Sequence, residues 1–117
     1  MDISTLKGEL AHFTGSESLY RHPLFGKSFT EGVKHMADAI GGYWLIDLIF
    51  AHQLDKKVKA TPFQVWKITS KNGRAAISLT DGDELPITDL ELEFTTFPEG
   101  ELSIWYAGNT LYLPSEH

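Results

Sequence analysis

The sequence contains no cysteine, which excludes a disulfide framework, a thiol nucleophile and any metal site with a cysteine ligand. Long apolar runs are also absent. The most apolar stretch, Tyr43 to Ala51, is interrupted by Asp47 and falls far short of the ~20 residues that a membrane-spanning helix needs. The N-terminus, Met1-Asp2-Ile3-Ser4, has neither the basic nor the apolar region of a targeting signal. We therefore expect a cytoplasmic protein that does not contact a membrane.

Basic residues are scarce in the second half of the chain. Residues 61–117 contain nine acids against Lys67, Lys71 and Arg74, whereas residues 1–60 contain seven acids and seven bases. Between Asp81 and Glu101 there are eight acids and no base. Because such a surface repels a phosphate backbone, direct binding of nucleic acid is not expected.

The length and composition are those of a small globular protein. The 117 residues are 42% hydrophobic and 22% charged, and they include no repeat and no linker long enough to divide the chain. We therefore predict a single α+β domain over residues 1–117.

Three helices are predicted in the N-terminal half. Apolar residues recur at helical spacing from Ile3 to Phe13, with Ser4 as the cap and Gly15 as the end. The segment Ser16–Lys27 has no period and is expected to be a loop. A second helix should follow Thr30 as its cap, and after Gly41-Gly42 a third helix should run from Tyr43 to about Gln53.

Two hairpins are predicted in the C-terminal half, because Asn72-Gly73 and Gly108-Asn109 are strong signals for two-residue turns. The first turn places Trp66 opposite Leu79 and Ile68 opposite Ile77, all four on one face. The second turn, between Leu102–Ala107 and Thr110–Leu113, pairs Ile104 with Leu113 and Tyr106 with Leu111 on one face. It pairs Trp105 with Tyr112 on the other.

A further strand is predicted at Asp89 to Thr96, with Leu90, Leu92 and Phe94 inward and Glu91 and Glu93 outward. The predicted fold therefore has two or three N-terminal helices packed on one face of a C-terminal antiparallel sheet of four to five strands.

Several short phrases together resemble an uncharacterised family of small bacterial proteins that are often encoded on plasmids and other mobile elements. The phrases span nearly the whole chain: Phe13-Thr14-Gly15, Tyr20-Arg21-His22-Pro23, Val33-Lys34 through Tyr43-Trp44-Leu45, Phe63-Gln64-Val65-Trp66 and Leu113-Pro114-Ser115-Glu116. The family is described only as a domain of unknown function. The resemblance implies a bacterial or phage setting and brings no catalytic residue with it.

Tyr20-Arg21-His22 is the phrase with the most chemical potential. A guanidinium beside an imidazole and a phenol could bind a carboxylate or a phosphate and transfer a proton. Asp47 stands alone in an apolar helical run, and if it is buried, Arg21 or His22 could be its partner. The favoured interpretation is structural: such a pair would fix the loop onto the helices.

Other motifs are weaker. His35 with Asp38, and His52 with Asp55, have the spacing of helical metal ligands, but each is a pair without a third ligand, so no metal or cofactor is expected. The third helix offers almost no polar side chains to a DNA groove, so the two helices around Gly41-Gly42 are interpreted as core helices.

The predicted outer face of the sheet is the remaining candidate for function. Glu91, Glu93, Trp105 and Tyr112 should project there, and large aromatics beside acids are common in interaction patches. We therefore expect a non-enzymatic protein-interaction or inhibitory module that contacts a protein partner, with a basic, nucleic-acid-binding protein as one candidate. The alternatives are a small-ligand-binding protein or enzyme that uses Tyr20, Arg21 and His22 with Asp47, and a homodimer formed through the outer face.

Overall fold

The computed structural model describes residues 3–13, 19–83, 85–92 and 97–116. Its helices are α1 (Ile3–Leu10), α2 (Glu31–Ile40), α3 (Tyr43–His52) and α4 (Lys56–Lys59), and a 3-10 turn spans Pro114–Glu116. Its strands are β1 (Leu19–Arg21), β2 (Ser28–Thr30), β3 (Phe63–Lys71), β4 (Arg74–Thr80), β5 (Pro86–Leu92), β6 (Gly100–Ala107) and β7 (Thr110–Tyr112).

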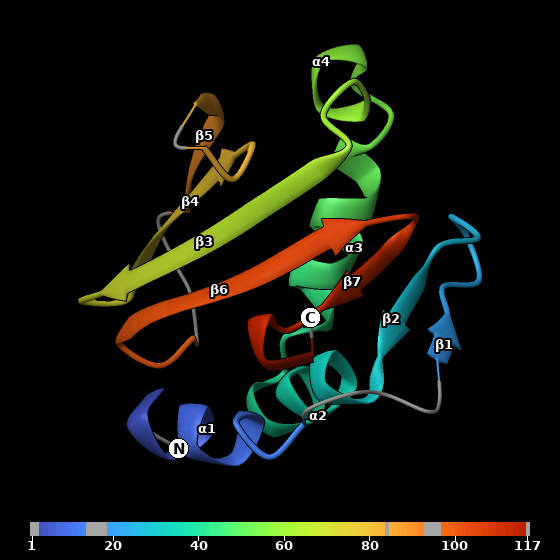
Figure 1. The fold of residues 1–117 in the computed structure, drawn as a ribbon. Helices are drawn as coiled ribbons and strands as arrows, with labels where there is room; N and C mark the ends of the chain where they lie inside the picture. Colours follow the sequence, from blue (N-terminus) through green and yellow to red (C-terminus); the bar gives the residue numbers. More distant parts are fainter. Residues whose placement is uncertain (1–2, 14–18, 84, 93–96, 117) are drawn as a thin grey trace.

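All described strands form one sheet of seven strands in the order β1-β2-β7-β6-β3-β4-β5 (Figure 1). The α+β class is confirmed, but the predicted purely antiparallel sheet of four to five strands is wrong. The sheet is mixed because β2 pairs with β7 in parallel, with Ser28 opposite Thr110 and Phe29 opposite Leu111. The helices are also not all N-terminal to the strands, since β1 and β2 precede α2.

The hairpin of β1 and β2 lies where the sequence predicted a loop. Leu19, Tyr20 and Arg21 pair with Thr30, Phe29 and Ser28, and the turn between them contains Pro23 and Gly26. Strands of three residues are too short to show a period of two. Moreover, β2 is held by residues near the other end of the chain, and such non-local pairing leaves no local signal.

Both predicted hairpin registers are confirmed. Trp66 pairs with Leu79 and Ile68 with Ile77. Trp105 pairs with Tyr112 and Tyr106 with Leu111, but the ladder ends there, without the predicted pair of Ile104 with Leu113. At both turns the residue pairs have positive φ, 55° and 76° at Asn72-Gly73, and 57° and 61° at Gly108-Asn109. This geometry is the reason that Asn-Gly type pairs fix a two-residue hairpin.

The helix boundaries agree in part with the prediction. Thr30 caps α2 by accepting the N–H of Val33, and Gly41, in the left-handed conformation, ends it. Helix α1 already begins at Ile3, so the prediction of Ser4 as its cap is wrong, and Gly15 lies outside the described residues. The short α4 was not predicted; Asp55 caps it by accepting the N–H groups of Lys57 and Val58.

Strand β5 covers only part of the predicted strand at Asp89 to Thr96. It spans Pro86–Leu92, with Asp89 and Glu91 exposed and Leu90 and Leu92 partly buried, as the alternation predicts. The positions of Glu93, Phe94 and Thr95 lie outside the described residues.

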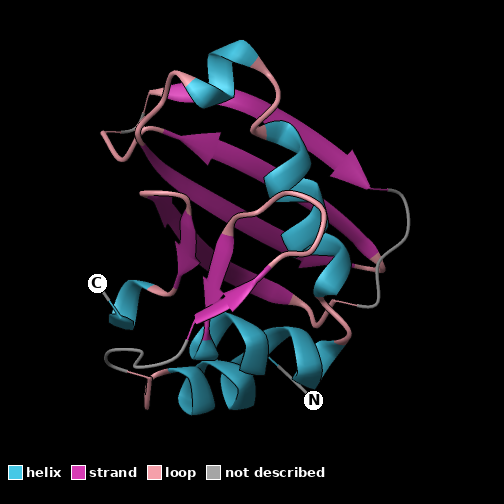
Figure 2. Cartoon of the chain, turned by 90° about the vertical axis from the view of Figure 1, so that its right-hand side faces the viewer, coloured by secondary structure: helices cyan, strands magenta, loops and turns pink. Residues whose placement is uncertain are grey.

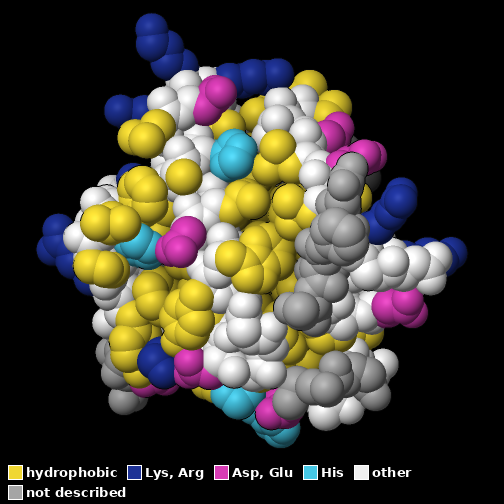
Figure 3. Space-filling view, turned by 180° about the vertical axis from the view of Figure 1, so that it is seen from behind, with side chains coloured by type: hydrophobic (Ala, Val, Ile, Leu, Met, Phe, Trp, Pro, Cys, Tyr) yellow, Lys and Arg dark blue, Asp and Glu magenta, His cyan; other side chains and the backbone are white. Residues whose placement is uncertain are grey.

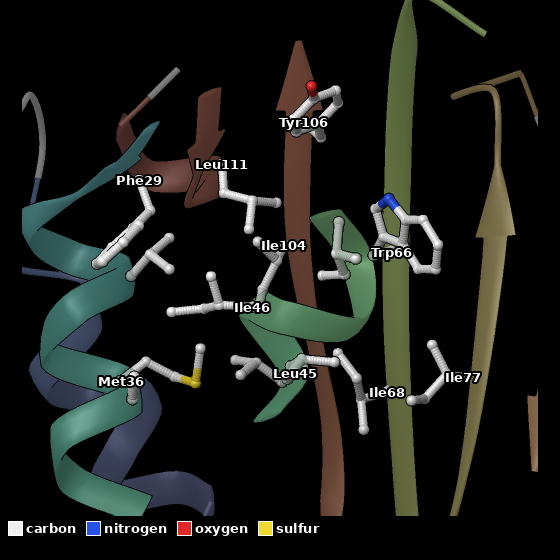
Figure 4. Packing of buried hydrophobic residues seen from close by; sticks show 14 of the residues in the cluster. Phe29, Met36, Leu45, Ile46, Trp66, Ile68, Ile77, Ile104, Tyr106 and Leu111 are labelled. Atoms are coloured by element: carbon white, nitrogen blue, oxygen red, sulfur yellow. The ribbon is translucent and has the colours of Figure 1, made fainter. Parts of the chain in front are cut away.

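The main core lies between α3 and the inner face of the sheet. Leu45 and Ile46 of α3 point toward Ile68 of β3 and Ile104 of β6, and all four are buried (Figure 4). Figure 2 shows α3 along one side of the strands, with α1 and α2 together at one end. The apolar stripe of α2 places Val33, Met36 and Ala37 in the same core.

A polar network is buried within this core. The side-chain amides of Gln53 and Gln64 donate to each other's oxygens at 2.8 and 2.9 Å, and Trp66 Nε1 donates to Gln64 Oε1 at 2.9 Å. Gln64 also donates to the carbonyls of Val58 and Thr61. The network joins α3, α4 and β3, and it satisfies polar groups that would otherwise be costly to bury.

None of the described helices has the length and hydropathy that crossing a lipid bilayer requires.

Candidate functional site

The outer face of the sheet is the side from which the side chains of Val65, Lys67, Trp105 and Tyr112 project. In Figure 1 strands β3 and β6 lie in front with α3 behind them, so no described helix covers this face. An antiparallel sheet often leaves one face to water. Here, however, the face combines three aromatic rings with charges of both signs.

The aromatic rings form one cluster near the β6–β7 turn, which we call the aromatic cluster: Phe63, Trp105 and Tyr112. The Trp105 ring packs edge-to-face on Phe63, with ring centroids 5.3 Å apart, and on Tyr112 at 6.1 Å. All three residues are half-buried. Burial raises the pKa of the Tyr112 phenol above its usual value of 10.0. The sequence identified Trp105 and Tyr112 but missed Phe63. The residue of β3 paired with Trp105 is Val65, and Phe63 is the diagonal neighbour of Trp105, two residues before Val65.

The acids between Asp81 and Glu101 are spread over several places instead of forming one continuous surface. Asp81 lies in the β4–β5 turn, where its carboxylate accepts the N–H groups of Asp83 and Leu85. Glu99 accepts the N–H of Asn72, and Glu101 lies 3.7 Å from Lys67. On β5, the acids that project on the outer-face side are Asp89 and Glu91.

Two hollows open on the outer face. The larger, about 340 Å³, is lined by Thr69, Lys71, Arg74 and Glu91, among others. The smaller, about 260 Å³, is lined by Val65, Lys67, Ser78 and Thr80, with Gly82 at its end. Both are open rather than enclosed, so they suit protruding side chains of another molecule better than a fully buried small ligand.

The second candidate group, Tyr20, Arg21, His22 and Asp47, is separated by the alternation of β1. Tyr20 stacks on Phe29 and His22 lies against Phe50, both on the helix side of the sheet. Arg21, between them, is exposed and belongs to the opposite face. Asp47 pairs with His22, with Nε2 and Oδ1 2.6 Å apart, and not with Arg21.

The hydrogen bonds of His22 define its tautomer. Nδ1 accepts the backbone N–H groups of Leu24 and Phe25 at 3.1 and 3.4 Å, so the proton lies on Nε2, which donates to Asp47. The imidazole is buried whereas the Asp47 side chain is 61% exposed. Because both ring nitrogens are occupied, the pair fixes the β1–β2 turn on α3 and leaves no imidazole nitrogen for a ligand.

A polar group that the sequence did not reveal joins α2 to α3. Asp38 accepts hydrogen bonds from Lys34 Nζ at 2.6 Å and from the Tyr43 hydroxyl. The bond to Lys34 lowers the pKa of Asp38, and the bond to Asp38 raises the pKa values of Lys34 and Tyr43. The spacing of Lys34 and Asp38, four residues apart on a helix, was the available signal.

The two histidine–aspartate pairs with the spacing of helical metal ligands have other partners. His35 bonds Glu9 at 3.1 Å, while Asp38 is occupied by Lys34 and Tyr43. His52 donates to the carbonyl of Leu48, and Asp55 caps α4. Across residues 3–13, 19–83, 85–92 and 97–116, no three histidine or acidic side chains lie close enough to hold a metal ion.

The helix side of the molecule presents a different surface. Seen from behind, hydrophobic side chains form a broken band down the middle, with Lys and Arg mostly at the rim (Figure 3). Leu24 and Leu54 are 83% and 78% exposed. Leu24 lies on the β1–β2 turn and Leu54 lies just after α3. The helix side is therefore the alternative to the outer face as a binding surface.

Comparison with protein families gives one match. The model of the "Family of unknown function (DUF6876)" matches residues 4–117. The chain belongs to this family. The DUF6876 match covers every described residue except Ile3, and it agrees with the resemblance to a domain of unknown function. Searches of curated proteins and of solved structures gave no match.

Proposed function

We propose that this DUF6876 protein is a non-enzymatic interaction module that binds a protein partner through the outer face of its sheet. The observation that carries the proposal is the aromatic cluster on a face that no described helix covers. Trp105 packs there between Phe63 and Tyr112. Aromatic residues at the centre of a patch, with charged residues around them, are typical of protein interfaces.

The charges around the cluster suggest which partner side chains fit. Asp89 and Glu91 have no ion pair within the described part of the chain, so both carboxylates remain available to basic side chains of a partner. Lys71 and Arg74 line the larger hollow with Glu91 and would take an acidic group. The partner is therefore expected to be a protein that places basic side chains over β5, such as a nucleic-acid-binding protein that the module inhibits.

The proposed setting is a bacterial cytoplasm, with the gene on a mobile element, as the resemblance of the sequence suggests. A second copy of the chain is the main competing occupant of the outer face. Light scattering at high concentration distinguishes the two, because a monomer leaves the face open for a partner.

The proposal is tested by affinity capture from a nuclease-treated bacterial lysate with variants on the two sides of the molecule. Trp105→Thr and Glu91→Lys alter the outer face: the first removes the central ring of the cluster, and the second reverses one charge. Leu54→Thr and Asp83→Lys are the matched controls, since both residues are exposed and neither lines one of the two hollows. Far-UV circular dichroism and thermal unfolding verify that each variant is folded.

We expect a protein that is captured by the wild type and by both controls, and that is lost or reduced by at least about tenfold with each outer-face variant. Full capture of the partner by a folded Trp105→Thr protein, with loss of capture by Leu54→Thr, would contradict the proposal and show that the partner binds the helix side.

A further inference from the structure

One edge of strand β6 is paired along its whole length, and the other edge is paired along only part of its length. On one side β3 pairs with it along its whole length, from Ser70 opposite Gly100 to Phe63 opposite Ala107. On the other side β7 pairs only with Trp105, Tyr106 and Ala107. Beyond Tyr112 the chain turns away into Pro114–Glu116. The segment Gly100–Ile104 therefore has one edge without a strand neighbour in the described part of the molecule.

The backbone groups on that edge belong to Ser103 and Glu101. In a two-residue hairpin the residues that flank the turn, Ala107 and Thr110, form a hydrogen-bonded pair. Alternate residues of a strand direct their N–H and C=O to the same side. The backbone groups on the β7 side are therefore those of Ala107, Trp105, Ser103 and Glu101. Within the described residues no hydrogen bond occupies the backbone N–H or C=O of Ser103.

A hollow of about 290 Å³ lies at this edge, between α1, β6 and the C-terminal turn. Its apolar lining includes the buried residues Leu10, Leu102 and Leu113, and its polar lining includes Lys7, Glu101 and Ser103. We call this hollow the β6 slot. In Figure 1 the C-terminal turn and α1, which carry part of its lining, lie below β6.

Both ends of the β6 slot are fixed. At one end Ile3 packs on Gly100 so closely that a Cβ there would lie 2.5 Å from Ile3 Cγ2. At the other end the C-terminal turn is held by Glu116, which accepts hydrogen bonds from the Thr30 hydroxyl at 2.7 Å and from the N–H of Leu113 at 3.0 Å. Ser115 in addition donates to the carbonyl of Leu10. The slot is thus part of the folded structure, not a gap that the C-terminal turn can simply fill.

The charges at the slot indicate the chemistry of its occupant. Lys7 has no carboxylate within ion-pair distance in the described part of the chain, whereas Glu101 is paired with Lys67 at 3.7 Å. An approaching chain therefore meets one uncompensated positive charge. A carboxylate beside Lys7 would complete the pair.

We propose that the β6 slot binds an extended, acidic peptide segment of a partner protein. The segment adds a short strand to β6, exchanges backbone hydrogen bonds with Ser103, places an apolar side chain on Leu10, Leu102 and Leu113, and places a carboxylate beside Lys7. Strand addition of this kind derives its affinity from main-chain hydrogen bonds and its specificity from alternate side chains. The proposal concerns an edge of the sheet and does not depend on the function proposed for the outer face.

The test uses a synthetic library of acetylated, amidated hexapeptides, from which the intact protein selects binders that are then measured by fluorescence polarisation. Ser103→Pro removes the N–H that the peptide needs, and proline is tolerated where a strand edge has no neighbour. Ser103→Ala keeps the N–H and is the matched control. Lys7→Glu reverses the charge in the slot, and Lys7→Arg, which keeps the positive charge, is its control.

We expect selected peptides to be rich in Asp or Glu at one position, and their affinity to fall by at least about tenfold in Ser103→Pro and Lys7→Glu. Ser103→Ala should stay within about twofold of the wild type. Selection of no peptide, selection of basic peptides, or equal binding by folded Ser103→Pro would overturn the proposal.

Amide hydrogen exchange of the wild-type protein gives a readout that needs no variant. The Ser103 amide should exchange quickly in the free protein and become protected when a selected peptide is added. A Ser103 amide that is already protected in the free protein would contradict the proposal, because its N–H would then have a partner.

Discussion

Gln53 and Gln64 exchange two hydrogen bonds between the end of α3 and the start of β3, and both residues are buried. The pair also receives the indole N–H of Trp66. Every described buried side-chain nitrogen and oxygen atom, these included, has a hydrogen-bond partner. A polar network of this kind determines how helix and sheet are aligned, because only one alignment satisfies every member.

Gln64→Leu should therefore lower the free energy of unfolding by about 2–4 kcal/mol, although leucine is more hydrophobic than glutamine. The substitution leaves the Gln53 amide, the Trp66 indole and the carbonyls of Val58 and Thr61 without this partner. Urea unfolding followed by tryptophan fluorescence measures the loss. The double variant Gln53→Leu/Gln64→Leu should be less destabilised than the sum of the two single variants. An additive result would show that the two amides do not act as a pair.

His22→Ala should destabilise the protein by about 2–4 kcal/mol, and Asp47→Asn by about 1 kcal/mol or less. The difference follows from burial. His22 packs on Phe25 and Phe50 and accepts two backbone N–H groups, whereas Asp47 contributes one hydrogen bond from an exposed position. Urea unfolding of the two variants gives the comparison. Equal costs would mean that the His22–Asp47 bond, rather than the packing of the ring, fixes the β1–β2 turn.

Gly100→Ala should cost about 1–3 kcal/mol of stability, because the residue has φ of 129° and its new Cβ would overlap Ile3. Gly73→Ala is the matched control: it also has positive φ, 76°, but no heavy atom lies within 4 Å of the new Cβ. Thermal unfolding should show a larger loss for Gly100→Ala, and Ile3→Ala should partly relieve it. Equal losses for the two alanine variants would attribute the whole effect to the backbone angle.

The hydrogen-bonded group of Lys34, Asp38 and Tyr43 predicts a pH dependence of stability. Its bond to Lys34 lowers the pKa of Asp38 from 3.8, so the ionised carboxylate stabilises the fold above that pH and its contribution is lost as the pH falls through the lowered value. Its bond to Asp38 raises the pKa of Tyr43 from 10.0, so the neutral phenol stabilises the fold below that pH and its contribution is lost as the pH rises through the raised value.

The stability difference between wild type and Asp38→Asn should therefore be largest near neutral pH and shrink at both extremes. Urea midpoints at a series of pH values measure it, with Asp83→Asn as an exposed control. In addition, the ultraviolet titration of Tyr43, assigned with Tyr43→Phe, should shift to lower pH in Asp38→Asn. A difference that is constant across the pH range would show that the hydrogen bonds to Asp38 do not persist in solution.

The parts of the fold that the sequence predicted are those with local causes. Asn72-Gly73 and Gly108-Asn109 fixed two registers through turn geometry, and Thr30 and Gly41 bounded α2 through capping. The parallel pairing of β2 with β7 was missed, since it joins segments from opposite ends of the chain and neither strand is long enough to show a pattern.

The candidate site was predicted with the same limits. The outward pairing of Trp105 with Tyr112 followed from the register of the hairpin. Phe63 joins the cluster through the pairing of β3 with β6, which no short turn connects and which the sequence therefore did not predict. Arg21 and His22 are neighbours in the sequence, but β1 sends them to opposite faces, and this could be seen only once β1 was known to be a strand. The unpaired edge of β6 likewise depends on where β7 ends.

The most direct test of the proposed binding face is site-specific photocrosslinking in bacterial cells. A photoreactive phenylalanine analogue at Ser78, on the outer face, should crosslink to one discrete protein species, whereas the same analogue at Leu54, on the helix side, should not. Ser78 suits the purpose because it is half-buried in the sheet yet lines the smaller hollow. A discrete crosslink from Leu54 with none from Ser78 would contradict the account and place the partner on the helix side.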